Sequence, residues 1–152
     1  MKLQIRNNQK IIKIDKRRIR GTVLKILKIL NCADKEISLS FVDDENIKQL
    51  NKQYLGKDKA TNVISFSLQE GEYSNINPQI LGDIIISVET AQRDAIKENL
   101  TVTQGLEFLI IHGILHLLGY NHENTTKKET NKMRQKEKEL FNAINGCNIR
   151  LI

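Results

Sequence analysis

The segment VTQGLEFLIIHGILHLLGYNH, residues 102–122, decides the fold of this chain. From 102 to 118 its residues are apolar nearly all round a helix, a pattern typical of a helix that is buried on every side. Gly119 is well suited to end that helix, because glycine readily adopts the left-handed conformation found just past a helix C-terminus. We therefore expect this helix at the centre of the molecule, covered by the rest of the chain.

Strands and further helices alternate along the remaining sequence. Alternating or continuously apolar residues predict strands at 2–14 (a strand or ribbon), 36–42, 61–68 and 80–89. The continuous apolar run of the last segment predicts a central strand that is covered on both faces. Helical spacing is found at 15–31, in a segment capped by Asp43 or Asp44, at 90–100 and at 125–144.

This interleaving predicts an α/β (α+β) fold: a single small sandwich with a mixed sheet of about four strands and a buried central helix. No repeat, low-complexity tract or Gly/Ser/Pro-rich linker divides the sequence. We therefore predict one domain over residues 1–152. The order of the strands does not follow from these patterns.

The composition is that of a globular protein, with 39% hydrophobic and 28% charged residues and a formal net charge of +6. This charge permits contact with a polyanion, although plain solubility also requires net charge. Cys32 and Cys147 lie far apart without CxxC spacing, which favours a reducing compartment over a disulfide framework. Residues 1–20 do not resemble a signal peptide, and no apolar run is long enough to span a bilayer, so we expect a cytoplasmic protein without membrane contact.

All 3 histidines of the chain fall within HGILHLLGYNH. His112 and His116 are four residues apart, which places them on one helix face. The turn after the helix can bring His122 to the same point, so we predict one zinc ion held by three imidazoles, with an open position for a reactant. Taken singly, each histidine would be assigned to core packing or to a surface loop. Nickel, copper and iron also accept imidazole ligands.

The residue after the first histidine is Gly113. In HExxH metalloproteases that residue is a glutamate, which acts as the general base. The sequence therefore argues against a peptidase of this kind. Activation of water would depend on the metal itself or on a carboxylate from elsewhere in the chain.

The block HGILHLLGYNH resembles the H-G-x-L-H-L-x-G-Y-[DN]-H signature of the YbeY family, bacterial rRNA maturation factors and metal-dependent endoribonucleases. LNKQYLGKDKATNVISFS at 50–67 and LGDIIIS at 81–87 are similar to the other blocks of that family, in the same order. The segment MRQKEKEL stands where the family has its closing helix. The resemblance covers about residues 36–144.

The resemblance implies a zinc-dependent hydrolase that cuts single-stranded RNA. Its role would be to finish the 3′ end of the small-subunit ribosomal RNA and to act in ribosome quality control, with ribosomal RNA and the small subunit as partners. Carried over by position, His112, His116 and His122 would bind one zinc ion per chain.

Three residues depart from the family pattern. Leu55 stands where the family usually has an arginine, whose guanidinium fork suits a phosphate group. Lys57 and Lys59 lie close by and could partly substitute as point charges, and we predict Lys57 as a catalytic residue that positions the RNA backbone. Ala60 replaces a usual proline, and Asn121 replaces a frequent aspartate beside the third histidine.

Two carboxylates are further candidates. Asp83 lies in the apolar segment LGDIIIS, and we predict it as a catalytic residue in the wall of the site, a role that the resemblance slightly favours. The alternative is a strand residue that hydrogen-bonds a neighbouring loop. Glu123 could act as a base but is more simply an exposed loop residue. Basic residues gather at 13–20 and at 127–138. Glutamates dilute the second cluster, so a solvated helix face is its simpler interpretation.

Three functions fit these features. The first is a metal-dependent endoribonuclease of ribosome maturation. The second is a metal-stabilised ribosome-assembly factor that binds rRNA or a small-subunit protein without cutting, which the leucine at position 55 favours. The third, a small-molecule metallohydrolase, fits the ligands but leaves the basic charge unused.

Overall fold

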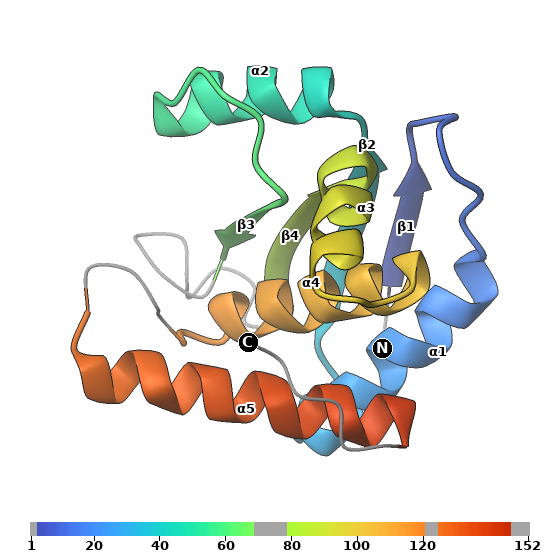
Figure 1. The fold of residues 1–152 in the computed structure, drawn as a ribbon. Helices are drawn as coiled ribbons and strands as arrows, with labels where there is room; N and C mark the ends of the chain where they lie inside the picture. Colours follow the sequence, from blue (N-terminus) through green and yellow to red (C-terminus); the bar gives the residue numbers. More distant parts are fainter. Residues whose placement is uncertain (1–2, 69–78, 121–124, 147–152) are drawn as a thin grey trace.

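The computed structural model describes residues 3–68, 79–120 and 125–146. These residues form a four-stranded sheet in the order β1-β2-β4-β3 (Figure 1). Its strands are β1 (Leu3–Asn7), β2 (Glu36–Val42), β3 (Val63–Ser67) and β4 (Ile80–Ser87). β1, β2 and β4 run parallel, and β3 pairs antiparallel with β4 at one edge. The predicted mixed α/β sheet is thus confirmed, as is the central position of β4.

Five helices surround this sheet in the described part of the chain: α1 (Lys16–Ile29), α2 (Asp44–Leu55), α3 (Val88–Lys97), α4 (Val102–Leu117) and α5 (Lys127–Asn145). Helix α2 covers one face, where Ile47 packs with Ile64 and, at its border, Phe66. Helices α1, α4 and α5 lie on the other face, and α3 packs against α4 (Figure 1). The main core fills the space between the sheet and α4.

The predicted strand or ribbon at 2–14 is wrong beyond Asn7. The N–H of Asn8 still bonds the carbonyl of Phe41 on β2, and beyond Asn8 the chain leaves the sheet, because the side chain of Gln9 replaces ladder hydrogen bonds with local ones. Its Oε1 accepts from the backbone N–H of Ile11 at 2.8 Å and of Ile12 at 3.0 Å, while its Nε2 donates to the carbonyl of Ile12 at 2.9 Å. A side chain that bonds its own neighbouring backbone in this way competes with secondary structure.

Helix α4 is buried as the sequence predicts. Thr101 and Gln104 form a capping box at its start, in which each side chain accepts from the other's backbone N–H. At its end, Gly119 has a φ of 97°. The N–H of Gly119 bonds the carbonyl of His116, and that of Tyr120 bonds the carbonyl of Leu115. These two bonds make a Schellman motif, so the predicted glycine stop is confirmed.

No single helix among these residues is long and apolar enough to cross a membrane. Helices α3 and α4 reach that length and apolarity only as a pair, with a bend of 109° between them.

Candidate metal centre

The last two turns of α4 bring two imidazoles together. His112 Nε2 lies 3.1 Å from His116 Nε2, and the ring planes are inclined at 76°. Both rings lie on the face of α4 that is only partly covered, and the side chain of His112 is 17% exposed. The spacing of four residues therefore has the predicted effect: it directs two ring nitrogens at one point.

A buried carboxylate holds the first of these rings from behind. Glu137 of α5 is 7% exposed, and its Oε1 lies 3.3 Å from Nδ1 of His112. When Nδ1 carries the proton and donates it to this carboxylate, Nε2 of the neutral ring is left as an acceptor that faces His116. Phe108 lies against the same ring, with 6.3 Å between the ring centroids. Glu137 and Phe108 together hold the position and orientation of His112, and Glu137 favours the tautomer that carries its proton on Nδ1.

The two Nε2 atoms have the separation expected of two ligands on one metal ion. Two nitrogens that each lie about 2.0–2.1 Å from a tetrahedral zinc ion are about 3.3 Å apart, close to the separation between these Nε2 atoms. A ligating histidine commonly donates its second ring N–H to a carboxylate, as His112 can to Glu137. A hydrogen bond accounts for the same contact when His116 carries its proton on Nε2.

The predicted third ligand, His122, lies outside the described residues. Among those that the structure describes, no three histidine, cysteine, aspartate or glutamate side chains gather around one point. The structure brings His112 and His116 into contact. The complete site, with His122 as its third residue, remains a prediction.

Gly113 has a packing role that explains why no glutamate follows the first histidine. A Cβ at this position would lie 2.8 Å from Cγ2 of Ile84 on the central strand. The residue therefore faces the sheet and allows α4 to lie close to β4. A general base placed here would point into the core.

The predicted catalytic residue Asp83 lies on the other face of the sheet. Ile84 points at α4, and successive side chains of a strand point to opposite faces, so exposed Asp83 points away from α4. Its neighbour in the ladder is Phe66, which packs on the α2 side. The structure therefore does not bring Asp83 to the histidine pair, and its catalytic role stays a prediction.

The predicted Lys57 follows the end of α2. Gly56 ends this helix with a φ of 70°, and the N–H of Lys57 bonds the carbonyl of Asn51. Buried Asn51 also donates from Nδ2 to the carbonyl of Lys59 at 2.9 Å, which anchors the turn. Leu55 is 52% exposed just before it. The turn holds its lysines at the surface, and their catalytic role stays a prediction.

Glu137 is the residue that analysis of the sequence missed. Its signal is visible in the pattern of α5, whose buried side chains are Met133, Glu137, Leu140 and Phe141. This is the spacing of one helix face. A glutamate in the middle of an apolar face is seldom buried without a partner, so its presence there pointed to a specific contact.

The fold and the site define a class of protein: an α/β sandwich in which a histidine pair on the central helix is backed by a buried carboxylate. The family model described as Endoribonuclease YbeY matches residues 4–145. This chain belongs to that family, and the predicted family is confirmed.

Relatives named Endoribonuclease YbeY match over most of their length. One from Syntrophus aciditrophicus (strain SB) is 58% identical over 146 residues, which are 96% of this chain and 91% of the relative. One from Syntrophotalea carbinolica is 46% identical over 142 residues, 93% of this chain and 95% of the relative. The solution structure of TM1509 from Thermotoga maritima is similar with a TM-score of 0.65 and 27% identity, and the match covers 95% of this chain and 89% of that one.

Proposed function

We propose that this protein is a metal-dependent endoribonuclease that cuts single-stranded RNA in ribosome maturation, at the 3′ end of the small-subunit rRNA, and in ribosome quality control. Membership in the endoribonuclease YbeY family supports the class of reaction. The contact of 3.1 Å between the Nε2 atoms of His112 and His116, with Glu137 behind it, is the observation that carries the metal dependence.

In this proposal His112, His116 and His122 hold one divalent ion, with zinc as the expected metal. Glu137 fixes the tautomer and orientation of His112. A bound ion supplies a Lewis acid for hydrolysis of a phosphodiester bond. Lys57 and Lys59 add positive charge for the RNA backbone, and the net charge of +6 attracts the strand.

A second candidate is an assembly factor that binds rRNA or a small-subunit protein without cutting it. The observation in its favour is Leu55, an exposed leucine at the position where the family resemblance implies an arginine. A lysine nearby offers a point charge but not the two parallel hydrogen bonds of an arginine fork. Binding without cleavage is the result that separates the two candidates.

The test uses the purified full chain and one RNA sequence in single-stranded and duplex form. We expect cleavage of the single strand alone, its loss on chelation, and its return when zinc is added back. Elemental analysis should give one ion per chain, and His122→Ala should lose that ion. RNA that is bound and left intact by metal-loaded protein would favour the assembly factor, while cleavage that survives both chelation and the variant would refute the metal mechanism.

A further inference from the structure

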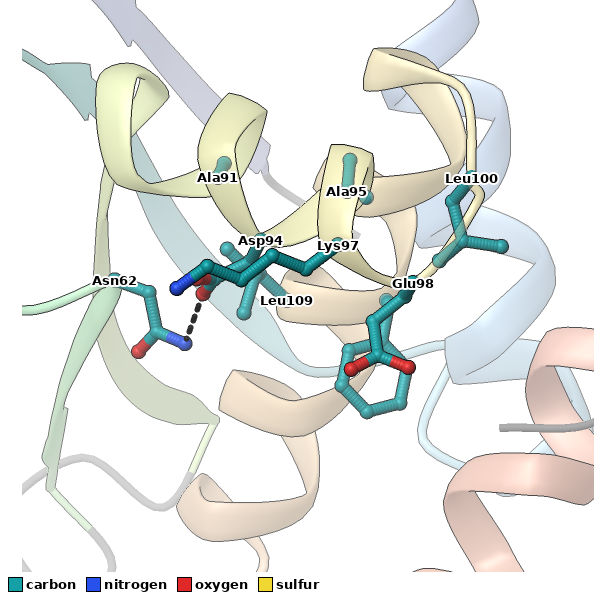
Figure 2. A pocket seen from close by; sticks show the side chains of 10 residues that line it. Asn62, Ala91, Asp94, Ala95, Lys97, Glu98, Leu100 and Leu109 are labelled. Atoms are coloured by element: carbon teal, nitrogen blue, oxygen red, sulfur yellow. Dashed lines mark hydrogen bonds between the residues drawn. The ribbon is translucent and has the colours of Figure 1, made fainter. Parts of the chain in front are cut away.

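A cavity of about 180 Å³ lies between α3, α4 and the residues that precede β3 (Figure 2). Its inner wall is apolar and buried, and is formed largely by Ala91, Ala95 and Leu109. Its polar groups are half-buried or exposed, so they form a rim. Asn62 and Asp94 on this rim are hydrogen-bonded to each other.

The cavity continues the face of α4 that carries the histidines. Phe108 and Leu109 line it, and they precede His112 by four and three residues, which is the spacing of one helix face. A helix rises about 1.5 Å per residue, so Leu109 lies only about 4.5 Å from His112 along the axis. Phe108 borders both places, since its ring also lies against His112. A strand whose phosphate reaches the histidine pair would therefore pass this opening.

The size of the cavity suits one planar ring. It is smaller than the roughly 300–1,000 Å³ of pockets for drug-sized ligands. A cavity of about 150 Å³ in another protein holds a benzene molecule. An apolar wall with an aromatic side chain and a polar rim is also how proteins receive a base taken out of its stack.

The rim selects among possible occupants. Asn62 Nδ2 donates one of its two N–H groups to Asp94 Oδ2 at 3.2 Å, which leaves the oxygens of both side chains as acceptors and the second N–H of Asn62 as a donor. The carboxylate of Asp94 matches the amino groups of cytosine, adenine and guanine, as carboxylates do for cytosine N4, whereas uracil has no amino group and its two carbonyls are repelled by that charge. Asp94 and Glu98 also place two negative charges beside the single positive charge of Lys97, which disfavours a phosphate.

We propose that this cavity is a base pocket for one unpaired nucleobase that carries an amino group, supplied by the RNA strand whose backbone reaches the histidine pair. The pocket would add recognition of a base to the proposed cleavage of RNA. It rests on that proposed function, because the bound base is taken to come from the RNA substrate. It makes Asp94 a specificity-determining residue and gives the strand a fixed register relative to the histidines.

Binding of free nucleosides tests the pocket without any cleavage step. The ¹⁵N-labelled full chain is titrated in turn with cytidine, adenosine, guanosine, uridine and inorganic phosphate, and NMR chemical shifts are followed. We expect one or more of the amino-bearing nucleosides to shift the side-chain amide of Asn62 and the backbone amides of Gly105 and Phe108. Uridine and phosphate should shift them far less.

Asp94→Asn keeps the size of the side chain and removes its charge. It should weaken binding of the amino-bearing nucleoside about tenfold, because a hydrogen bond to a charged acceptor is lost, and should narrow the difference from uridine. Asp34→Asn is the matched control, since Asp34 is exposed and does not line the cavity. The proposed pocket would be overturned by equal chemical-shift changes with uridine or phosphate, by changes only at residues away from the cavity, or by no changes at all. An unchanged nucleoside affinity in Asp94→Asn would also overturn it. Nucleoside binding by a chain that cuts no RNA would instead count against the proposed function alone.

Discussion

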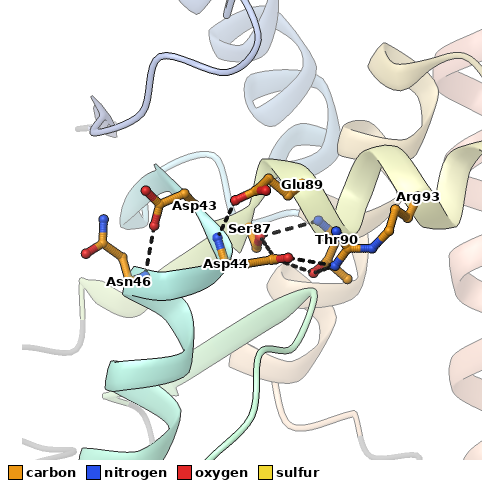
Figure 3. A network of polar contacts seen from close by, with 7 residues as sticks. All are labelled: Asp43, Asp44, Asn46, Ser87, Glu89, Thr90 and Arg93. Carbon is orange, nitrogen blue, oxygen red and sulfur yellow. Dashed lines mark hydrogen bonds and ion pairs between the residues drawn. The ribbon is translucent and has the colours of Figure 1, made fainter.

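Two polar clusters of this molecule use their groups in opposite ways. In the first, Asp44 at the start of α2 accepts from the hydroxyls of Ser87 and Thr90, both at 2.6 Å, and from Arg93 at 2.7 Å (Figure 3). Glu89 in turn accepts from the backbone N–H of Asp44 at 2.9 Å. This Asp44 network ties the first turn of α2 to the end of β4 and to α3. Each donor in this network is paired with an acceptor, which is typical of a structural cluster.

The histidine pair is the opposite case, because the donor and acceptor roles of its facing ring nitrogens depend on the tautomer. His112 and His116 direct like atoms at each other, and two ring nitrogens in this position need either a shared proton or a shared cation. The Nδ1 side of His112 is held by Glu137. The comparison teaches that a site is distinguished from a scaffold by where its groups point, since both clusters contain partly buried, hydrogen-bonded polar residues. Substitutions in the pair should therefore affect metal and activity, and substitutions in the network should affect stability.

The largest effect is expected for His116→Ala. Loss of a ligand should reduce RNA cleavage about 1,000-fold, because a metal ion contributes several kcal/mol to stabilisation of the transition state. It should also abolish the rise in Tm that zinc gives the native chain, since an ion that binds only the folded state stabilises it. Tm scans with and without zinc, beside a cleavage assay, measure both. A variant that still gains stability from zinc would show that the ion binds elsewhere.

Glu137→Gln should have the next largest effect. The amide keeps the shape of the side chain but removes the charge that orients His112, a change that typically costs 10–100-fold in metal affinity. Competition with a chromogenic chelator measures this affinity. Glu139→Gln is the matched control on the same helix, because Glu139 is 53% exposed and its partner is the surface residue Lys136. Equal affinities of the two variants would remove Glu137 from the site.

The difference between the two clusters also marks what the sequence could predict. The histidine spacing, the glycine stop and the buried character of α4 are local patterns, and each was predicted. The strand order depends on how the chain crosses between β2 and β4, which no local pattern encodes. The side of the sheet that Asp83 faces follows from alternation only once the position of α4 is known. The contact between Glu137 and His112 joins residues 25 positions apart, so no local pattern predicts it. The one signal in the sequence is a glutamate on the apolar face of α5.

Asp44→Asn should destabilise the fold and leave the metal affinity unchanged. The loss of charge-assisted hydrogen bonds in a partly exposed cluster should cost about 1–2 kcal/mol in the free energy of unfolding, measured by urea denaturation at neutral pH. Glu45→Gln on the same turn of α2 is the control, because Glu45 is exposed and outside the network. A change in zinc affinity in Asp44→Asn alone would break the proposed separation of the two clusters.

The same variant has a predictable pH dependence. Burial by itself would raise the pKa of Asp44, but hydrogen bonds from Ser87, Thr90 and Arg93, together with the charge of Arg93, outweigh it and hold the pKa below its usual value. A carboxyl whose pKa is lowered by folding stabilises the fold above its unfolded pKa of about 3.9 and loses that effect as the pH falls through the folded value. The stability difference between the native chain and Asp44→Asn should therefore shrink in acid.

Leu55→Arg should have the smallest effect. The Asp44 network holds the first turn of α2, and this variant tests whether the last turn of the same helix contacts RNA. Leu55 is 52% exposed, so the substitution should leave the stability nearly unchanged. An arginine fork that grips a phosphate should raise cleavage by about three- to tenfold. Leu55→Lys adds the same charge without the fork and separates the two contributions. Equal gains from both variants would assign the effect to charge, and no gain from either would show that this turn does not contact the cleaved strand.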